Sequence, residues 1–294
     1  MQIPIDPNTP EMRRRRFRPI PVRMLVPNVI TLLAICAGLT AIRLSTEGRM
    51  ELAVAAIVFA AMLDGIDGRV ARMIKGQSKF GAELDSLADF VNFGVAPGLI
   101  LYFWQLHELH NGGWIAAMVF AISGGLRLAR FNATMDDPNK PPFAANYFTG
   151  VPAPAGAIIA LLPIFLAFLG LPKPPAMLTA VYTLLIAFLM VSRLPVFSGK
   201  TVRMRVPPEM VLPVFVVVVL AFALLLSYPW VVLTVGTLAY LCCLPLGWLS
   251  YRDYQRKDEA AAAAAAASVS EAAQPDATLA IERDGEHDRP ARLN

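Results

Sequence analysis

Long apolar segments separated by short polar breaks dominate the pattern of this chain. A transmembrane helix needs about 20 consecutive apolar residues, and eight segments approach that length. Proline-rich breaks separate several of them, because proline disrupts a helix beyond its first turn. The segments cover roughly residues 24–44, 51–74, 84–106, 113–133, 152–170, 175–195, 208–227 and 229–249. The pattern predicts an all-α, polytopic membrane protein with about eight transmembrane helices.

The composition supports this interpretation. Hydrophobic residues make up 56% of the 294 residues and charged residues 16%, whereas soluble domains carry about 25% charged residues. Cys36, Cys242 and Cys243 all lie within apolar segments. We interpret them as small buried residues, because their spacing fits neither a metal site nor a disulfide framework. We expect membrane lipids as partners and no nucleic acid.

The polar ends divide the chain into three parts. Residues 1–23 form a basic arm, residues 24–250 the membrane domain, and residues 251–294 a cytoplasmic tail. The arm either attracts anionic lipid head groups or only sets the topology. In the tail, the alanines at 260–267 favour helix. The polar stretch that follows has too little apolar surface to pack, so we expect it to be disordered.

Basic residues gather on one side of the predicted helices. Loops on the cytoplasmic side of a membrane carry the excess of lysine and arginine. With the N-terminus inside, the outer loops hold only Arg43, Arg49 and Lys173. Both termini are therefore expected in the cytoplasm. The inner segments hold Arg13, Arg14, Arg15, Arg16, Arg18, Arg23, Arg69, Arg72, Lys75, Lys79, Arg127, Arg130, Lys140, Arg193, Lys200, Arg203 and Arg205.

Four aspartates lie at the cytoplasmic junction of the second and third apolar segments. Asp64 and Asp67 are three residues apart, and Asp85 and Asp89 are four apart, so each pair shares one helix face. Carboxylates at membrane depth are costly and usually functional. If the two faces meet, the four carboxylates form a site of the kind that hard divalent cations prefer. Two such cations could clamp a diphosphate.

Other interpretations of these aspartates stay open. They could line the path of a divalent-cation transporter, or pair with Arg69 and Arg72 as structural ion pairs. Neither interpretation explains why the small residues Gly68 and Ala71 share the site. Small residues let a ligand approach closely, and Arg72 can offer a planar fork to a phosphate.

The segment from Asp64 to Asp89 resembles the motif of the CDP-alcohol phosphatidyltransferases, Asp-x2-Asp-Gly-x2-Ala-Arg-x8-Gly-x3-Asp-x3-Asp, at all eight constrained positions. The resemblance implies an integral membrane enzyme that transfers a substituted phosphate from a CDP-linked donor to an alcohol and releases CMP. It implies that the four aspartates bind two divalent ions, Mg²⁺ or Mn²⁺, and that Asp89 also takes the proton of the acceptor hydroxyl. The residues implied to bind the CDP-linked donor are Gly68, Ala71, Arg72 and Gly81, and Lys79 is a further candidate for a lipid phosphate.

Further segments resemble the bacterial, serine-using branch of this family. They cover residues 27–31, 85–97, 125–132 and 148–154. One departure is Asn92 before Phe93, where a small hydroxyl residue is expected. The resemblance implies CDP-diacylglycerol and L-serine as substrates, a homodimer, and a place in the bacterial inner membrane with the active site on the cytoplasmic side.

The acceptor pocket must lie outside the aspartate motif. The carboxylate of serine needs a cation, and Arg127 and Arg130, three residues apart, are the first candidates. His107 and His110 fall on the predicted outer side, so a histidine base is not expected. A sibling transferase that uses glycerol 3-phosphate, inositol phosphate or choline stays open, because the aspartates do not select the acceptor.

Overall fold

The fold is taken from a computed structural model. It describes residues 22–74, 78–135, 147–192, 195–197, 208–245 and 256. Nearly all of the predicted basic arm and tail lie outside these residues, as do Lys140, Arg193 and Lys200. The three-part division of the chain therefore stays a prediction.

Helices account for almost all of the described residues, which confirms the all-α prediction. A π-helix, η1 (Phe90–Val95), joins α3 to α4, and a 3-10 turn, η2 (Leu106–Leu109), follows α4. Two short strands, β1 (Tyr147–Thr149) and β2 (Pro195–Phe197), form an antiparallel ribbon. The helix that we call the last helix spans Pro229–Pro245. The other helices are α1 (Val22–Thr46), α2 (Met50–Met73), α3 (Lys79–Asp89), α4 (Ala96–Trp104), α5 (Asn111–Met135), α6 (Ala153–Ala160), α7 (Leu162–Phe168), α8 (Ala176–Val191) and α9 (Pro208–Ser227).

Each predicted apolar segment coincides with a helix or with consecutive helices. Among the described residues, four helices are long and apolar enough to cross a membrane: Leu25–Thr46, Lys79–Trp104, Asn111–Thr134 and Met210–Ser227. The second of these is a single rod, because α3, η1 and α4 follow one another without a break. Ala176–Val191 and Pro229–Pro245 are shorter apolar helices. The chain is therefore a multi-pass membrane protein.

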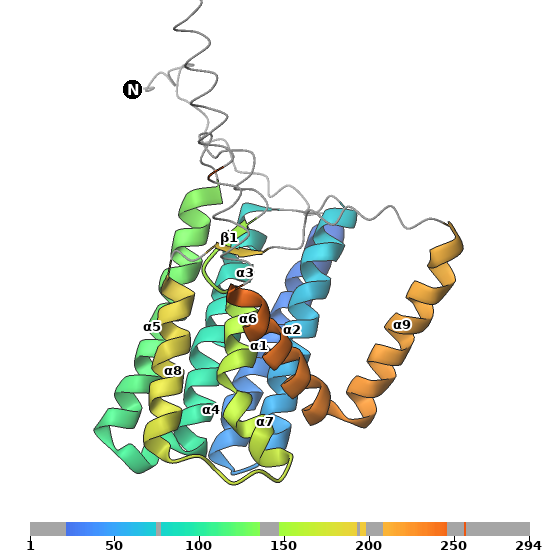
Figure 1. The fold of residues 1–294 in the computed structure, drawn as a ribbon. Coiled ribbons are helices and arrows are strands. Elements are labelled where there is room, and N and C mark those ends of the chain that lie inside the picture. The colour runs from blue at the N-terminus through green and yellow to red at the C-terminus, as the bar shows by residue number, and fades with distance from the viewer. Residues whose placement is uncertain are drawn as a thin grey trace, which may run out of the picture.

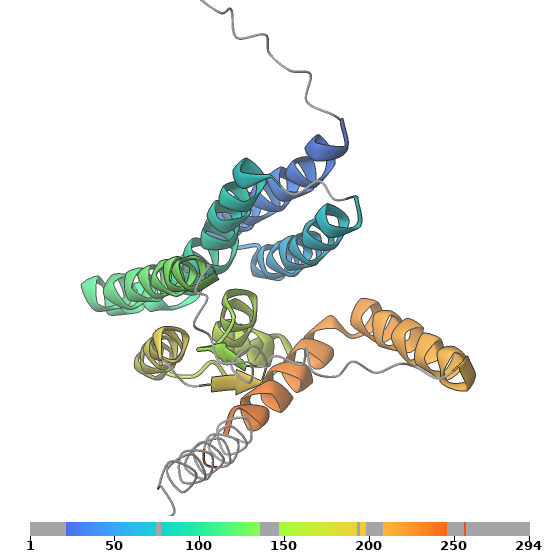
Figure 2. The same ribbon diagram turned by 90° about the horizontal axis from the view of Figure 1, so that it is seen from above.

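The helices α1 to α8 stand side by side, while α9 stands apart from them (Figure 1). The view from above shows the same separation (Figure 2). No residue in the span-length window of α9 is buried, and such an uninterrupted apolar surface suits lipid. The last helix begins two residues after α9 ends, so the two helices form a tight hairpin. It returns to the bundle, where the rings of Trp230 and Phe168 lie 4.6 Å apart.

Glycines bring the backbones of the α3–η1–α4 rod and α5 into contact. A Cβ atom on Gly98 would lie 2.9 Å from the carbonyl oxygen of Ala117, and one on Gly94 would lie 3.3 Å from that of Ala121. On the other side, a Cβ on Gly124 would lie 3.1 Å from the Cα of Gly94. Small residues allow such close packing between membrane helices. They therefore fix the position of the rod against α5.

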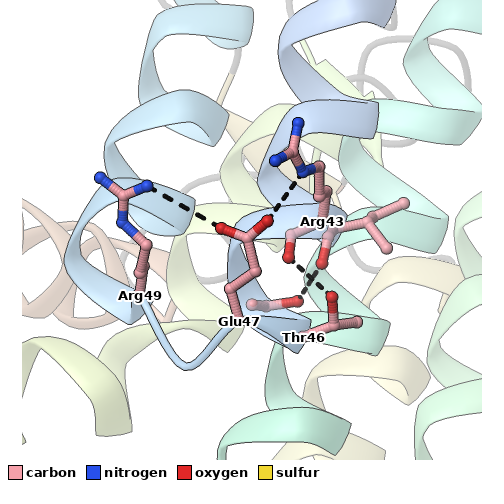
Figure 3. A network of polar contacts seen from close by, with 6 residues as sticks. Arg43, Thr46, Glu47 and Arg49 are labelled. Atoms are coloured by element: carbon pink, nitrogen blue, oxygen red, sulfur yellow. Dashed lines mark hydrogen bonds and ion pairs between the residues drawn. The ribbon is translucent and has the colours of Figure 1, made fainter.

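The connection between α1 and α2 carries a network of exposed charges (Figure 3). Nε of Arg43 donates to Glu47 at 2.8 Å, and Nη1 of Arg49 lies 3.8 Å from the same carboxylate. Exposed pairs of this kind contribute about 0–1 kcal/mol. The network lies at the end of α1 opposite to its proline-containing start, and the outer position of this loop stays a prediction.

The cysteines correct one expectation. Cys36, Cys242 and Cys243 are free thiols, but all three are exposed instead of buried. An apolar position on a membrane helix can face lipid as well as the protein interior. Hydrophobicity along the chain therefore does not distinguish these two environments.

The glycine contact predicts a stability difference within one helix pair. Gly98→Ala should lower the stability by about 1–3 kcal/mol, because the added methyl group overpacks against the Ala117 carbonyl. Gly112→Ala on α5 is the matched control, since its Cβ would meet nothing within 4 Å. Thermal unfolding of the two purified variants in detergent measures the difference. Equal melting temperatures would show that the contact is not tight.

Candidate active site

The facing sides of α2 and α3 bring the four aspartates together. One carboxylate oxygen from each of Asp64, Asp67 and Asp85 lies within 4.8 Å of the other two. Asp89 lies beside Asp64, close enough for the two carboxyl groups to interact. The spacing thus predicts the convergence that the structure shows, while the role of each residue as a metal ligand stays a prediction.

The start of α3 sets the direction in which its aspartates point. Ser78 caps the helix, and its Oγ accepts a hydrogen bond from the backbone nitrogen of Gly81 at 2.9 Å. A Cβ on Gly81 would lie 2.8 Å from Oδ1 of Asn28 on α1. Gly81 therefore permits close packing between α1 and α3, in addition to its predicted contact with the donor. Asp85 and Asp89 follow one and two turns later.

A threonine that the sequence argument did not single out holds one of the aspartates. Oγ1 of Thr31 on α1 donates to Oδ2 of Asp67 at 2.7 Å. Thr31 is 4% exposed and Asp67 is 3% exposed. Sequence offers only a weak signal for this contact, a hydroxyl residue one turn after Pro27 in an apolar helix. The bond fixes the orientation of the Asp67 carboxylate.

No basic side chain in the described part of the chain forms an ion pair with the acidic cluster. Among the described residues, the ion pairs within 4.0 Å are those of Arg43 and Arg49 with Glu47. The interpretation of Asp64 and Asp67 as partners of Arg69 and Arg72 is therefore wrong. Carboxylates so close together repel one another strongly in a medium of low dielectric constant. A set of hard oxygen ligands without a cationic side chain fits a divalent cation.

The residues predicted to bind the donor lie at the same end of α2 and α3. If Gly68 carried a Cβ atom, the nearest neighbouring atom would be Nη1 of Arg72, at 4.0 Å. The surface beside Asp64 and Asp67 is therefore open enough for a ligand to approach the α2 backbone. Ala71 adds a second small residue on this helix, and Lys79 begins α3. Their contacts with a nucleotide stay predictions.

The two candidate arginines of the acceptor pocket have different surroundings. Arg127 is 9% exposed and lies close enough to Asp89 to interact with its charge. Its Nε has no hydrogen-bond partner in the described part of the chain. By contrast, Nη1 of Arg130 donates to the carbonyl oxygen of Val191 at 2.5 Å, which caps the end of α8. Arg127 is thus the arginine next to the aspartates, whereas Arg130 also has a structural role.

The π-helix η1 continues the aspartate face into the protein. Asn92 is 1% exposed, and neither polar atom of its side chain has a partner among the described residues. A Cβ on Gly38 would lie 2.0 Å from its Oδ1, so α1 approaches this side chain through a glycine. Short π-helical segments often occur at functional sites. The departure noted at Asn92 therefore lies in the π-helix that directly follows Asp89.

The histidines are far from this cluster. His107 belongs to η2, which follows the end of α4 opposite to the aspartates. His110 comes just after it and has a backbone φ of 49°. Both residues lie beyond the opposite end of the rod that carries Asp85 and Asp89, as the topology predicts.

Comparison with known protein families shows to which family this chain belongs. Residues 24–192 match the family model described as CDP-alcohol phosphatidyltransferase, and residues 209–245 match that of CDP-alcohol phosphatidyltransferase 2. The chain belongs to the CDP-alcohol phosphatidyltransferase family. The predicted resemblance, the transferase class and the membrane location are thereby confirmed.

Individual members of this family extend the likeness over most of the chain. The chain is 39% identical over 230 residues to a CDP-diacylglycerol–serine O-phosphatidyltransferase of Mycobacterium tuberculosis, which covers 78% of this chain and 79% of the relative. It is 40% identical over 236 residues to the protein of the same name from Mycobacterium leprae, which covers 79% and 77%. The corresponding Helicobacter pylori protein is 40% identical over 148 residues, covering 50% and 60%.

The bond between Thr31 and Asp67 predicts a specific defect. Thr31→Val should weaken divalent-metal activation by about tenfold, since a hydrogen bond to a charged group contributes about 1.5–3 kcal/mol. The measurement is the Mg²⁺ or Mn²⁺ concentration that gives half-maximal activity. Thr40→Val is the control, because its Oγ1 bonds to the Cys36 carbonyl on an exposed part of the same helix. If both changes raised the required metal concentration equally, Thr31 would have no specific role in holding Asp67.

Proposed function

We propose that this CDP-alcohol phosphatidyltransferase is a phosphatidylserine synthase. It would convert CDP-diacylglycerol and L-serine into phosphatidylserine and CMP. The observation that carries the proposal is a buried arginine, Arg127, beside an acidic cluster that already fits a divalent cation. The acidic cluster with its cation offers a binding place for a diphosphate, and Arg127 offers a second one for an anionic acceptor. The names of the similar mycobacterial proteins support serine as that acceptor.

The proposed reaction is a direct displacement at phosphorus. The serine hydroxyl oxygen forms a bond to the phosphorus that carries diacylglycerol, and the bond from this phosphorus to the CMP oxygen breaks. Asp89 accepts the hydroxyl proton, and CMP leaves with the bonding electron pair. Oδ1 of Asp89 is buried without a partner in the described residues, so it is available to accept that proton.

The acidic cluster would hold the metal ions of this reaction. Asp64, Asp67 and Asp85 supply the closest oxygen ligands, and Asp89 completes the predicted set. Divalent cations bound there would neutralise the diphosphate and stabilise the charge that develops on it. That the ions are Mg²⁺ or Mn²⁺, and that two of them bind, are parts of the proposal.

The surface of α3 suits a donor that stays in the bilayer. Phe80 and Leu87 are exposed on the helix that carries Asp85 and Asp89. Acyl chains could lie along these apolar side chains while the diphosphate reaches the aspartates. A bacterial inner membrane, with the site on its cytoplasmic side, is proposed from the lysine and arginine distribution. A homodimer is proposed from the family resemblance alone.

An acceptor panel tests the proposed function. The purified protein, supplied with CDP-diacylglycerol and Mg²⁺ or Mn²⁺, should release CMP with L-serine at a much higher rate than with glycerol 3-phosphate, inositol phosphate or choline. CMP release and lipid product are measured together. CMP release with another alcohol but not with serine would replace the proposal with a sibling transferase. Metal flux into proteoliposomes without any transfer would favour the cation transporter.

Removal of the proposed base should separate catalysis from binding. Asp89→Asn should lower the rate of CMP release by about 10³-fold, because general-base catalysis typically contributes about 10²–10⁴-fold. Donor binding, measured by the protection that CDP-diacylglycerol gives against thermal unfolding, should persist. Glu83→Gln, at an exposed carboxylate of the same helix, is the matched control. Turnover near the wild-type rate in Asp89→Asn would contradict the assignment.

A further inference from the structure

Among the residues that the structure describes, five hold buried polar side-chain atoms that lack a hydrogen-bond partner. Within the described part of the chain these residues are Asp89, Asn92, Arg127, Thr237 and Tyr240. More than about 90% of buried polar groups in proteins are paired, so each exception requires an explanation. Three of the five belong to the surroundings of the aspartates described above. The other two belong to the last helix.

Contacts between these residues place them in one region. Arg127 lies close enough to interact electrostatically with both Asp89 and Tyr240. Asn92 follows Asp89 by three residues, within the π-helix η1. Tyr240 follows Thr237 by three residues in the last helix, so these two side chains lie on one side of that helix. Thr237 is only 3% exposed, which places that side against the bundle. The last helix thus places the hydroxyl group of Tyr240 close to Arg127, with Thr237 one turn earlier on the same side of that helix.

Neighbouring hydroxyl groups show that packing alone does not require unpaired groups. Thr234, on the same side of the last helix, donates to the carbonyl oxygen of Trp230 at 2.7 Å. The hydroxyl of Tyr182 on α8 donates to the carbonyl oxygen of Ile159 at 2.8 Å. The same residue types nearby are therefore satisfied by the protein itself. Thr237 and Tyr240 differ because no protein partner is within reach in the described residues.

We propose, on the basis of the proposed function, that the last helix completes the acceptor site: Tyr240 and Thr237 line, with Arg127, a pocket for the carboxylate of an amino-acid acceptor. The planar guanidinium of arginine binds carboxylates well, and the two hydroxyl groups can donate to the same anion. Arg127 forms no ion pair within 4.0 Å among the described residues, so its charge is free for a ligand. Asp89, which also interacts with Arg127, receives the end of the acceptor that carries the reacting hydroxyl.

The arrangement explains how one small molecule can satisfy several unpaired groups. The carboxylate of the acceptor accepts from Arg127, Tyr240 and Thr237, and its hydroxyl donates to Asp89. An alcohol without an anionic group leaves the first three residues unpaired, and buried polar groups without partners are costly. The pocket therefore selects against neutral or purely cationic alcohols. The acidic cluster has no part in that choice.

Two variants that remove single oxygen atoms test the pocket. Tyr240→Phe and Thr237→Val should each raise the KM for L-serine by about tenfold, which is the loss expected for a hydrogen bond to a charged group. The KM for CDP-diacylglycerol and the kcat should stay at the wild-type values. Thr234→Val is the matched control, since its hydroxyl is already bonded within the last helix. It should leave the KM for serine unchanged.

Stability separates a binding role from a structural one. Neither Tyr240→Phe nor Thr237→Val removes a hydrogen bond from the described part of the unliganded protein, so the melting temperature should not fall. Thr237→Ser keeps the hydroxyl and should keep the wild-type KM. A lower melting temperature with an equal loss toward both substrates would overturn the proposal, as would an unchanged KM for serine in both variants.

The same measurements distinguish this proposal from the proposed function. If the wild type uses another anionic alcohol in place of serine, the proposed function is wrong, and the KM for that alcohol in Tyr240→Phe tests the pocket directly. If the wild type uses serine and the two variants do not affect its KM, the proposed function stands and the pocket is wrong. In an Arg127→Lys background, Tyr240→Phe should have a smaller effect, because the shared ligand contact is already weakened.

Discussion

The backbone contact between the α3–η1–α4 rod and α5 is the constraint on which the site depends. Membrane helices gain little from hydrophobic burial against one another, so close packing of small residues must hold them together. Gly94 and Gly98 meet the carbonyl groups of Ala121 and Ala117 across this contact. The rod carries Asp89 and α5 carries Arg127. Their separation follows from the glycine contact, because a larger residue at either position would move one helix away from the other.

Local spacing explains why much of the site could be predicted from sequence. Residues three or four apart share a helix face wherever the helix forms, so the two aspartate pairs and the open surface at Gly68 follow from the pattern alone. The apolar segments predict the helices for the same reason, since a span must be long and apolar whatever it packs against. In both cases the evidence lies within a single helix.

Contacts between distant segments could not be predicted in this way. Thr31 is 36 residues from Asp67, and its place in the first apolar segment is only a weak signal that it bonds to a carboxylate. Arg127 and Arg130 carry the same charge and lie one turn apart on α5, so the sequence does not distinguish them. The position of α8 explains why Arg130 donates to the carbonyl oxygen of Val191. The exposed cysteines show the same limit, because lipid and protein interior favour similar residues. The π-helix at Asn92 depends on how the rod fits against its neighbours.

The distribution of polar groups separates two kinds of chemistry within one small region. The carboxylates of α2 and α3 lie together, and no basic side chain of the described residues forms an ion pair with them, so a cation is the natural complement. Arg127 lies close to Asp89 but remains outside ion-pair distance. A direct pair would satisfy both groups and leave neither for a ligand. Leaving the two groups unpaired costs stability. In the proposed reaction that cost would be offset by a ligand that offers an anionic group to Arg127 and a proton to Asp89.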